Sequence, residues 1–146
     1  MSADTPDTSV GPGRSEAAFT SIDPVRRAAA IAVLLGGAVH LQQYWRVFHS
    51  QDIGPPFLAN AVASLLVGIA LLAWDGAVPT IIGVVLSGGS LLALLASRTT
   101  GLFGFDAVGY DVAEFEAIVA ETSAVFLLIW SLTREPLNRA LDRPSR

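Results

Sequence analysis

The sequence predicts an all-α protein whose four transmembrane helices form a bundle with both termini in the cytoplasm. Hydrophobic residues make up 52% of the 146-residue chain and charged residues only 15%, whereas soluble domains average about 25% charged residues. Four apolar segments of 18 to 20 residues follow one another, separated by short stretches rich in Gly, Pro and Asp. Most arginines lie in the parts of the chain that would fall on one side of a membrane crossed by these segments. Together these observations favour one membrane-embedded domain.

Residues 1–22 are predicted to be a disordered cytoplasmic tail, because Ser, Thr, Asp, Pro and Gly dominate them. The transmembrane domain is predicted over 23–133, and its first helix over about 24–48. Asp23 suits the N-cap of this helix and Pro24 suits its first position. A cleaved signal peptide is the competing interpretation, since two arginines precede the apolar stretch. The long preceding tail and the lack of a small-residue cleavage site argue against it.

Three further helices are predicted over about 57–74, 79–97 and 113–133, followed by an Arg-rich cytoplasmic tail over 134–146. Each apolar segment is long enough to cross a hydrocarbon core of about 30 Å. Four buried helices of a soluble bundle are the alternative. Amphipathic surface helices carry a polar face, and the second and third segments have none.

The distribution of arginines predicts the orientation. Seven lie on the side that holds both tails and the turn at 75–78, and two on the other side: Arg14, Arg26, Arg27, Arg134, Arg139, Arg143 and Arg146 against Arg46 and Arg98. All three Trp residues fall near helix ends, where interfacial rings are enriched. All nine basic residues are Arg, which is typical of GC-rich genomes. We therefore expect a multi-pass protein of a bacterial plasma membrane.

Composition also excludes several classes of function. A net charge of −4 leaves no basic surface for nucleic acid. The absence of Cys excludes disulfides, thiolate metal sites and Cys nucleophiles. His40 and His49 lie on one segment, which argues against a bis-histidine haem site, and no third metal ligand is apparent beside His40 and Glu121. We expect no cofactor and no metal. No nucleophile–base pair is readable, so the sequence leans away from an enzyme.

Two ionisable residues fall inside the predicted spans, and such residues are candidates for a functional site. His40 lies in the first helix and Glu121 in the fourth. Counting from the outer helix ends at 1.5 Å per residue places both about 10–12 Å deep, in the outer half. Whether they touch is open. Each could instead be a structural group that forms a hydrogen bond to a neighbouring helix.

Other polar residues gather in the same half. Tyr44 shares a face with His40, and Asn60 and Ser64 share a face of the second helix. Arg98 ends the third helix, either as an interfacial anchor or as a partner for Glu114 or Glu121. The predicted ligand-binding set is therefore His40, Tyr44, Asn60, Ser64, Arg98 and Glu121.

Small residues mark helix-packing positions: Gly36, Gly83, Ser87, Gly89 and Ala93. Such residues let helices approach closely. The prediction is packing inside the bundle, and an oligomer interface is the alternative.

The segment Arg98-Thr99-Thr100-Gly101-Leu102 resembles one found in uncharacterised small four-helix membrane proteins of high-GC Gram-positive bacteria. His40-Leu41 and Glu121 also match their pattern, and the resemblance covers about residues 26–132. In topology alone the chain is similar to DoxX-like proteins. Neither resemblance implies an activity. Both imply a four-helix membrane fold, and the first supports treating His40, Arg98 and Glu121 as a set.

Three functions remain open at this stage. The first is a non-enzymatic membrane protein with a small polar binding site in the outer half of the bundle. The second is an accessory subunit of a larger membrane complex, or a homo-oligomer. The third is a small proton-coupled transporter. The lipid bilayer is a partner in all three, and ligand, oligomeric state and physiological process are beyond the sequence.

Overall fold

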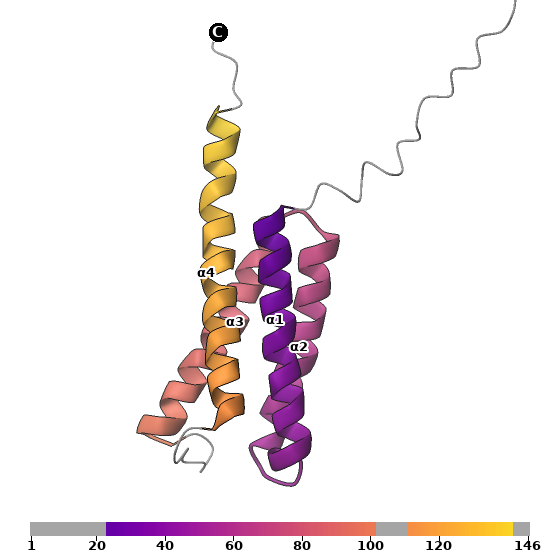
Figure 1. Ribbon diagram of the computed structural model, residues 1–146, viewed down its shortest axis with the longest axis vertical. Helices are drawn as coiled ribbons and strands as arrows, with labels where there is room; N and C mark the ends of the chain where they lie inside the picture. Colours follow the sequence, from indigo (N-terminus) through magenta and orange to yellow (C-terminus); the bar gives the residue numbers. More distant parts are fainter. Residues whose placement is uncertain (1–22, 102–110, 142–146) are drawn as a thin grey trace, which may run out of the picture.

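The computed structural model describes residues 23–101 and 111–141, so the predicted tail at 1–22 lies outside the described residues. Within those ranges every regular element is a helix, and the all-α prediction is confirmed. The elements are α1 (Pro24–Gln43), the π-helix η1 (Tyr44–Phe48), α2 (Gly54–Ala73), α3 (Ala77–Thr99) and α4 (Val112–Leu141). Successive α-helices run in opposite directions, so α1 begins and α4 ends toward the same end of the molecule (Figure 1).

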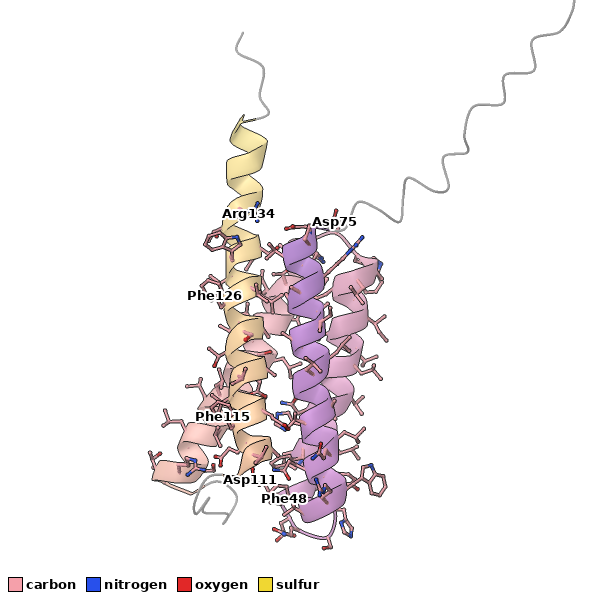
Figure 2. The ribbon with its side chains drawn as sticks, in the orientation of Figure 1. Phe48, Asp75, Asp111, Phe115, Phe126 and Arg134 are labelled. Atoms are coloured by element: carbon pink, nitrogen blue, oxygen red, sulfur yellow. The ribbon has the colours of Figure 1, made fainter. Side chains whose placement is uncertain are left out.

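Two ends of the helix assembly serve as landmarks below (Figure 2). The Asp75 end holds the start of α1 and the turn between α2 and α3. The Asp111 end holds η1, the end of α3 and the start of α4. α4 continues well beyond the other helices at the Asp75 end (Figure 1).

The first helix begins as its sequence predicts. Asp23 Oδ1 accepts a hydrogen bond of 3.2 Å from the backbone N–H of Val25, and Pro24 occupies the first turn. At its other end α1 continues directly into η1, and the N–H of Tyr44 donates to the carbonyl oxygens of His40 and Leu41. No sequence signal predicted this π-helix. Single π-turns within helices often occur at functional sites.

Two helix boundaries differ from the prediction. α2 begins at Gly54 rather than near residue 57, because prolines at the first turn of a helix sacrifice no intrahelical hydrogen bond. A Cβ at position 54 would collide with the carbonyl oxygen of Phe48, so the tight return of the chain requires glycine there. α4 continues to Leu141, past the predicted end at 133, although Pro136 lies within this extension and proline is unfavourable in a helix interior.

α3 packs against α4 more than against α2, its neighbour in the sequence. The connecting turn is short, but α3 leans away from α2 and packs more extensively against α4 (Figure 1). α1 packs against both α2 and α4 and is the central helix. The apolar core is built around it, mostly toward the Asp75 end, from Ala29, Ala30, Ala32, Val33, Val67, Leu71, Ala124 and Leu128.

Three of the four α-helices, the first counted together with η1, are long and apolar enough to span a membrane: Pro24–Phe48, Gly54–Ala73 and Ala77–Thr99. In the most apolar 18-residue stretch of each span, only 39%, 28% and 22% is buried, in chain order. Large apolar side chains such as Leu66, Val85 and Leu92 are exposed on the outside, and Phe126 points away from α1 (Figure 2). An apolar surface of this extent fits a protein embedded in a membrane.

Candidate functional site

The centre of the site is a contact between His40 on α1 and Glu121 on α4. His40 Nε2 and Glu121 Oε1 lie 2.8 Å apart, and the two side chains are 15% and 6% exposed. Gly36, one turn before His40, faces α4: a Cβ at that position would lie 3.5 Å from Glu121 Cγ, an ordinary van der Waals distance. The structure therefore answers the question that the sequence left open, and the two residues are in contact.

The His40 ring is held by neighbours from a third helix as well. The ring of Phe57 on α2 lies 5.3 Å from it, tilted by 60°, and Phe57 in turn packs on Phe48 of η1 at 4.4 Å. The remaining ring nitrogen, Nδ1, is buried and has no hydrogen-bond partner, and it is the one such atom among the described side chains. Because buried polar atoms are nearly always paired, this nitrogen marks the site for attention.

A second polar contact joins α3 to α4 nearer the Asp111 end. Arg98 Nε donates to Glu114 Oε1 at 2.7 Å, and Arg98 Nη2 also reaches both carboxylate oxygens. Glu114 lies seven residues before Glu121, on the same face of α4. Of the two partners that the sequence allowed for Arg98, the structure shows Glu114. The guanidinium is therefore paired with a carboxylate beside the His40–Glu121 contact, not within it.

Asp111 organises the start of α4 beside this pair. Its Oδ1 accepts a 2.7 Å bond from the backbone N–H of Glu114, the geometry of an N-cap. Its Oδ2 accepts a 3.3 Å bond from the Nε2 of Gln43. α1 and α4 are thus linked twice, at Gln43–Asp111 near the end and at His40–Glu121 deeper in.

A third polar group links α2 to α3. Ser64 Oγ donates to Asn60 Oδ1 at 3.0 Å, and Asn60 Nδ2 donates to Ser90 Oγ. Gly37 lets α1 approach this group, because a Cβ there would lie only 2.5 Å from Ser64 Cβ. Gly37 therefore admits α2, whereas Gly36 faces α4 on another side of α1.

The predicted binding set is only partly brought together. His40 and Glu121 touch, Asn60 and Ser64 form a separate network, and Arg98 belongs to the pair with Glu114. Tyr44 lies in η1, where its ring contacts that of Trp45 at 5.1 Å. Its hydroxyl has no hydrogen-bond partner among the described contacts.

Not all of the predicted packing positions lie at helix contacts. A Cβ at Gly83 would lie 2.8 Å from Leu128 Cδ1 of α4, and Ser87 is buried on the same helix. Gly36 serves the His40 site as described, and Ala93 is half-buried. Gly89 differs from the prediction, because it is exposed and a Cβ there would meet nothing within 4 Å. The small-residue stripe of α3 winds around the helix, so its members cannot all face the same neighbour.

Arg26 is a buried arginine that the sequence reading counted only as a cytoplasmic charge. It is 2% exposed. Its Nε donates to the carbonyl oxygen of Leu71 at 2.8 Å, and its Nη1 donates to that of Gly76 at 3.1 Å and to Thr80 Oγ1 at 3.2 Å. Its Nη2 reaches the carbonyl oxygen of Trp74. These carbonyls end α2 and form its turn, where unpaired helix C=O groups need donors.

A sequence signal for Arg26 did exist. Arg26, Val33 and His40 are spaced by seven residues, so they fall on one stripe of α1, and Ala29, Ala30 and Ala32 between them are buried as well. Arg26 lies on this inward stripe, whereas Arg27 next to it faces outward. An arginine in such a position indicates a side chain that bonds to another helix rather than a solvated charge.

Toward the Asp75 end the His40–Glu121 pair borders the apolar core. Ala124 and Leu128 follow Glu121 along the same α4 face and are fully buried, with Val33 of α1 beside them. The nearby charged groups, Arg98, Glu114 and Asp111, lie on the other side. The pair is thus bounded by apolar packing toward the Asp75 end and by charged groups toward the Asp111 end.

The chemistry available to the pair is hydrogen bonding and proton exchange. Among the side chains that the structure describes, no three His, Asp or Glu residues lie close enough to hold a metal ion. A scan against protein-family models, a search of curated proteins and a search of solved structures returned no match to this chain.

Proposed function

We propose that the chain is a non-enzymatic protein of a bacterial plasma membrane whose four helices form a bundle with a small polar binding site in its outer half. The contact between His40 and Glu121 carries the proposal. Ionisable groups are costly at membrane depth and usually mark functional sites. This pair is retained where three helices converge, with one buried ring nitrogen left for a further contact.

The proposed placement has the Asp75 end in the cytoplasm and the Asp111 end outside. Trp74 and Trp130 near the first end and Trp45 near the second are all exposed, which suits two interfacial belts. The excess of arginines in the two tails supports the same orientation. In this placement α4 spans the membrane with the other three helices, since its apolar side chains Phe115, Phe126 and Ile129 are exposed as theirs are.

The ligand we propose is small and polar and enters from outside. The partly exposed edge of His40 would contact it, and Tyr44 and Asn60 lie on the same half of the bundle. The apolar core on the cytoplasmic side of Glu121 supports a one-sided site. For this reason we favour binding over proton-coupled transport, which needs access from both sides.

Native mass spectrometry of protein released gently from its own membranes tests the proposal. We expect a defined extra mass on the wild-type chain. The Glu121→Ala variant should lose this mass while keeping its helical content. Glu116→Ala removes a carboxylate from an exposed position of the same helix and serves as the matched control, which should retain the mass.

Two results would contradict the proposed binding site. One is a bare wild-type chain under conditions that preserve bound lipids on other membrane proteins. The other is equal retention of the extra mass in the Glu121→Ala and Glu116→Ala variants. Either result would mean that His40 and Glu121 only hold the helices together and bind no ligand.

An accessory subunit or homo-oligomer is the second candidate. The observation that favours it is the outward face of α3, where Gly88 and Gly89 have open space around them and would admit a helix of another chain. A stoichiometric partner, or a second copy, should co-purify with the wild type and be lost on Gly89→Leu. A monodisperse monomer would count against this candidate.

A further inference from the structure

At the Asp111 end the helices form two pairs, and each pair is held together by its own contacts. In the first pair, α1 and α2, the ring of Phe57 packs on the ring of His40 at 5.3 Å. In the second pair, α3 and α4, the guanidinium of Arg98 binds the carboxylate of Glu114. Each pair therefore has its own reason to move as a unit.

Hydrogen bonds link the two pairs to each other in this half of the assembly. The links that the structure describes are His40–Glu121, Gln43–Asp111 and Asn60–Ser90. Apolar packing adds little to them. Among the described residues, Ser97 is the one buried side chain of α3 from position 88 onward, and Glu121 is the one buried side chain of α4 up to that position. Neither helix buries a large apolar side chain here.

The half at the Asp75 end is joined differently. Core side chains of α1, α2 and α4 pack together there. A Cβ on Gly83 of α3 would lie 2.8 Å from Leu128 Cδ1 and 3.4 Å from Val67 Cγ1, so α3 meets α4 and α2 at one point. Arg26 also ties α1 to the turn between α2 and α3. Close packing of this kind is a main source of helix association in membranes.

The two kinds of contact differ in how easily they separate. A hydrogen bond between helices in a membrane contributes little on average, and groups that separate near water exchange it for bonds to water. Asp111 is exposed and Gln43 is half-buried. Parts of a protein with few buried apolar contacts and exposed hydrogen bonds open first. Toward this same end, α3 already leans away from α1 and α2 (Figure 1).

We propose that the helix assembly opens at its Asp111 end, where the α3–α4 pair moves away from the α1–α2 pair while the apolar core at the Asp75 end stays closed. Opening separates the His40 ring, which stays with Phe57, from the Glu121 carboxylate, which stays on α4. Both polar side chains then face the space between the pairs. The movement needs no ligand, but its role as the entrance to a binding site rests on the proposed function.

Distances between two spin labels, measured by pulsed electron paramagnetic resonance, test the opening. The sample is the full chain in lipid nanodiscs without added ligand. The chain has no Cys, so labelled cysteines can replace exposed apolar residues. The Asp111-end label pair is Leu58→Cys on α2 with Leu95→Cys on α3, and the Asp75-end label pair is Leu72→Cys with Ile82→Cys on the same two helices.

Removing a link between the pairs should favour the open form. In Glu121→Ala we expect the ratio of long to short distances for the Asp111-end label pair to rise about threefold, the effect of losing one average hydrogen bond between helices. The Asp75-end label pair should not change. Glu116→Ala, at an exposed position of the same helix, is the matched control and should leave both label pairs unchanged. If Glu121→Ala does not fold, Asn60→Ala takes its place, because it removes another of the three links.

Two results would overturn the inference. In one, the distances of the Asp111-end label pair stay those of the wild type when a link is removed. In the other, both label pairs lengthen equally, which would mean that the whole assembly loosens. The mass measurement is decided separately. A bound mass without opening would refute the opening alone, and opening of a chain that carries no ligand would contradict only the binding site.

Discussion

Replacing Arg26 by methionine should destabilise the helix assembly at its Asp75 end. The side chain donates four hydrogen bonds, to the carbonyl oxygens of Leu71, Trp74 and Gly76 and to Thr80 Oγ1. Methionine fills similar space but leaves these acceptors without a donor. The closing turn between α2 and α3 would then lose the group that ties it to α1.

The magnitude follows from the four bonds. At about 0.6 kcal/mol each, the average for side-chain hydrogen bonds in a membrane, they contribute about 2 kcal/mol. At about 1.5 kcal/mol each, typical of bonds to a charged group, they contribute about 6 kcal/mol. We expect the lower half of this range, because methionine also relieves the cost of burying the guanidinium.

The assay is reversible denaturant unfolding in detergent micelles. Arg27→Met is the control, because it removes the same charge from an exposed position next along the helix, and it should cost less than about 1 kcal/mol. Arg26→Lys keeps the charge but not the planar fork of donors and should fall between wild type and Arg26→Met. Equal unfolding free energies for Arg26→Met and Arg27→Met would refute the role of Arg26 in holding the turn between α2 and α3 to α1.

Two further predictions concern helix packing and the second ion pair. Gly37→Ala should destabilise the protein by about 1–3 kcal/mol, because its Cβ would lie 2.5 Å from Ser64 Cβ. Gly89→Ala, at a position with open space, should be neutral or stabilise by up to about 1 kcal/mol. Thermal unfolding in detergent measures both, and equal losses of stability would contradict the close packing of Gly37 against α2. A double-mutant cycle with Arg98→Gln and Glu114→Gln should give a coupling free energy of about 1 kcal/mol or more, since both side chains are largely buried, and strict additivity would argue against their contact.

The four helices could be predicted because their physical causes are local. Uninterrupted apolar runs determine where a chain can cross a membrane, and Pro55 with Pro56 or Asp75 with Gly76 interrupt them visibly. The boundary error at Gly54 arose where residues that a first helical turn accepts were read as loop, and the continuation after 133 runs through Pro136, which no local preference predicts. Propensity alone does not say which of two permitted states such residues adopt.

The sequence predicted how deep His40 and Glu121 lie along their helices but not whether their side chains touch. Counting residues placed His40 and Glu121 at similar heights, because rise per residue is constant. Which faces of two helices meet depends on packing across the whole assembly. The same limit explains why Arg98 and Tyr44 could be assigned to one half of the molecule but not to a partner.

Arg26 shows a different limit. A count of arginines treats each as a solvated charge, so it assigns Arg26 and Arg27 the same role. The structure separates them by a rotation of about 100° about the helix axis, which buries one and exposes the other.

The central claim is that all four helices cross the membrane, with the His40–Glu121 site in the half that faces outward. The chain has no Cys, so single cysteines can be introduced and labelled in intact cells with a membrane-impermeant maleimide. The test uses four exposed positions: Ser50, Asp75 and Thr100, which follow helices, and Arg134, which lies on α4 at the Asp75 end (Figure 2). We predict labelling of the Ser50→Cys and Thr100→Cys variants in intact cells, and of Asp75→Cys and Arg134→Cys only after the membrane is permeabilised. The reverse pattern, or labelling of Thr100→Cys and Arg134→Cys from the same side, would contradict the account.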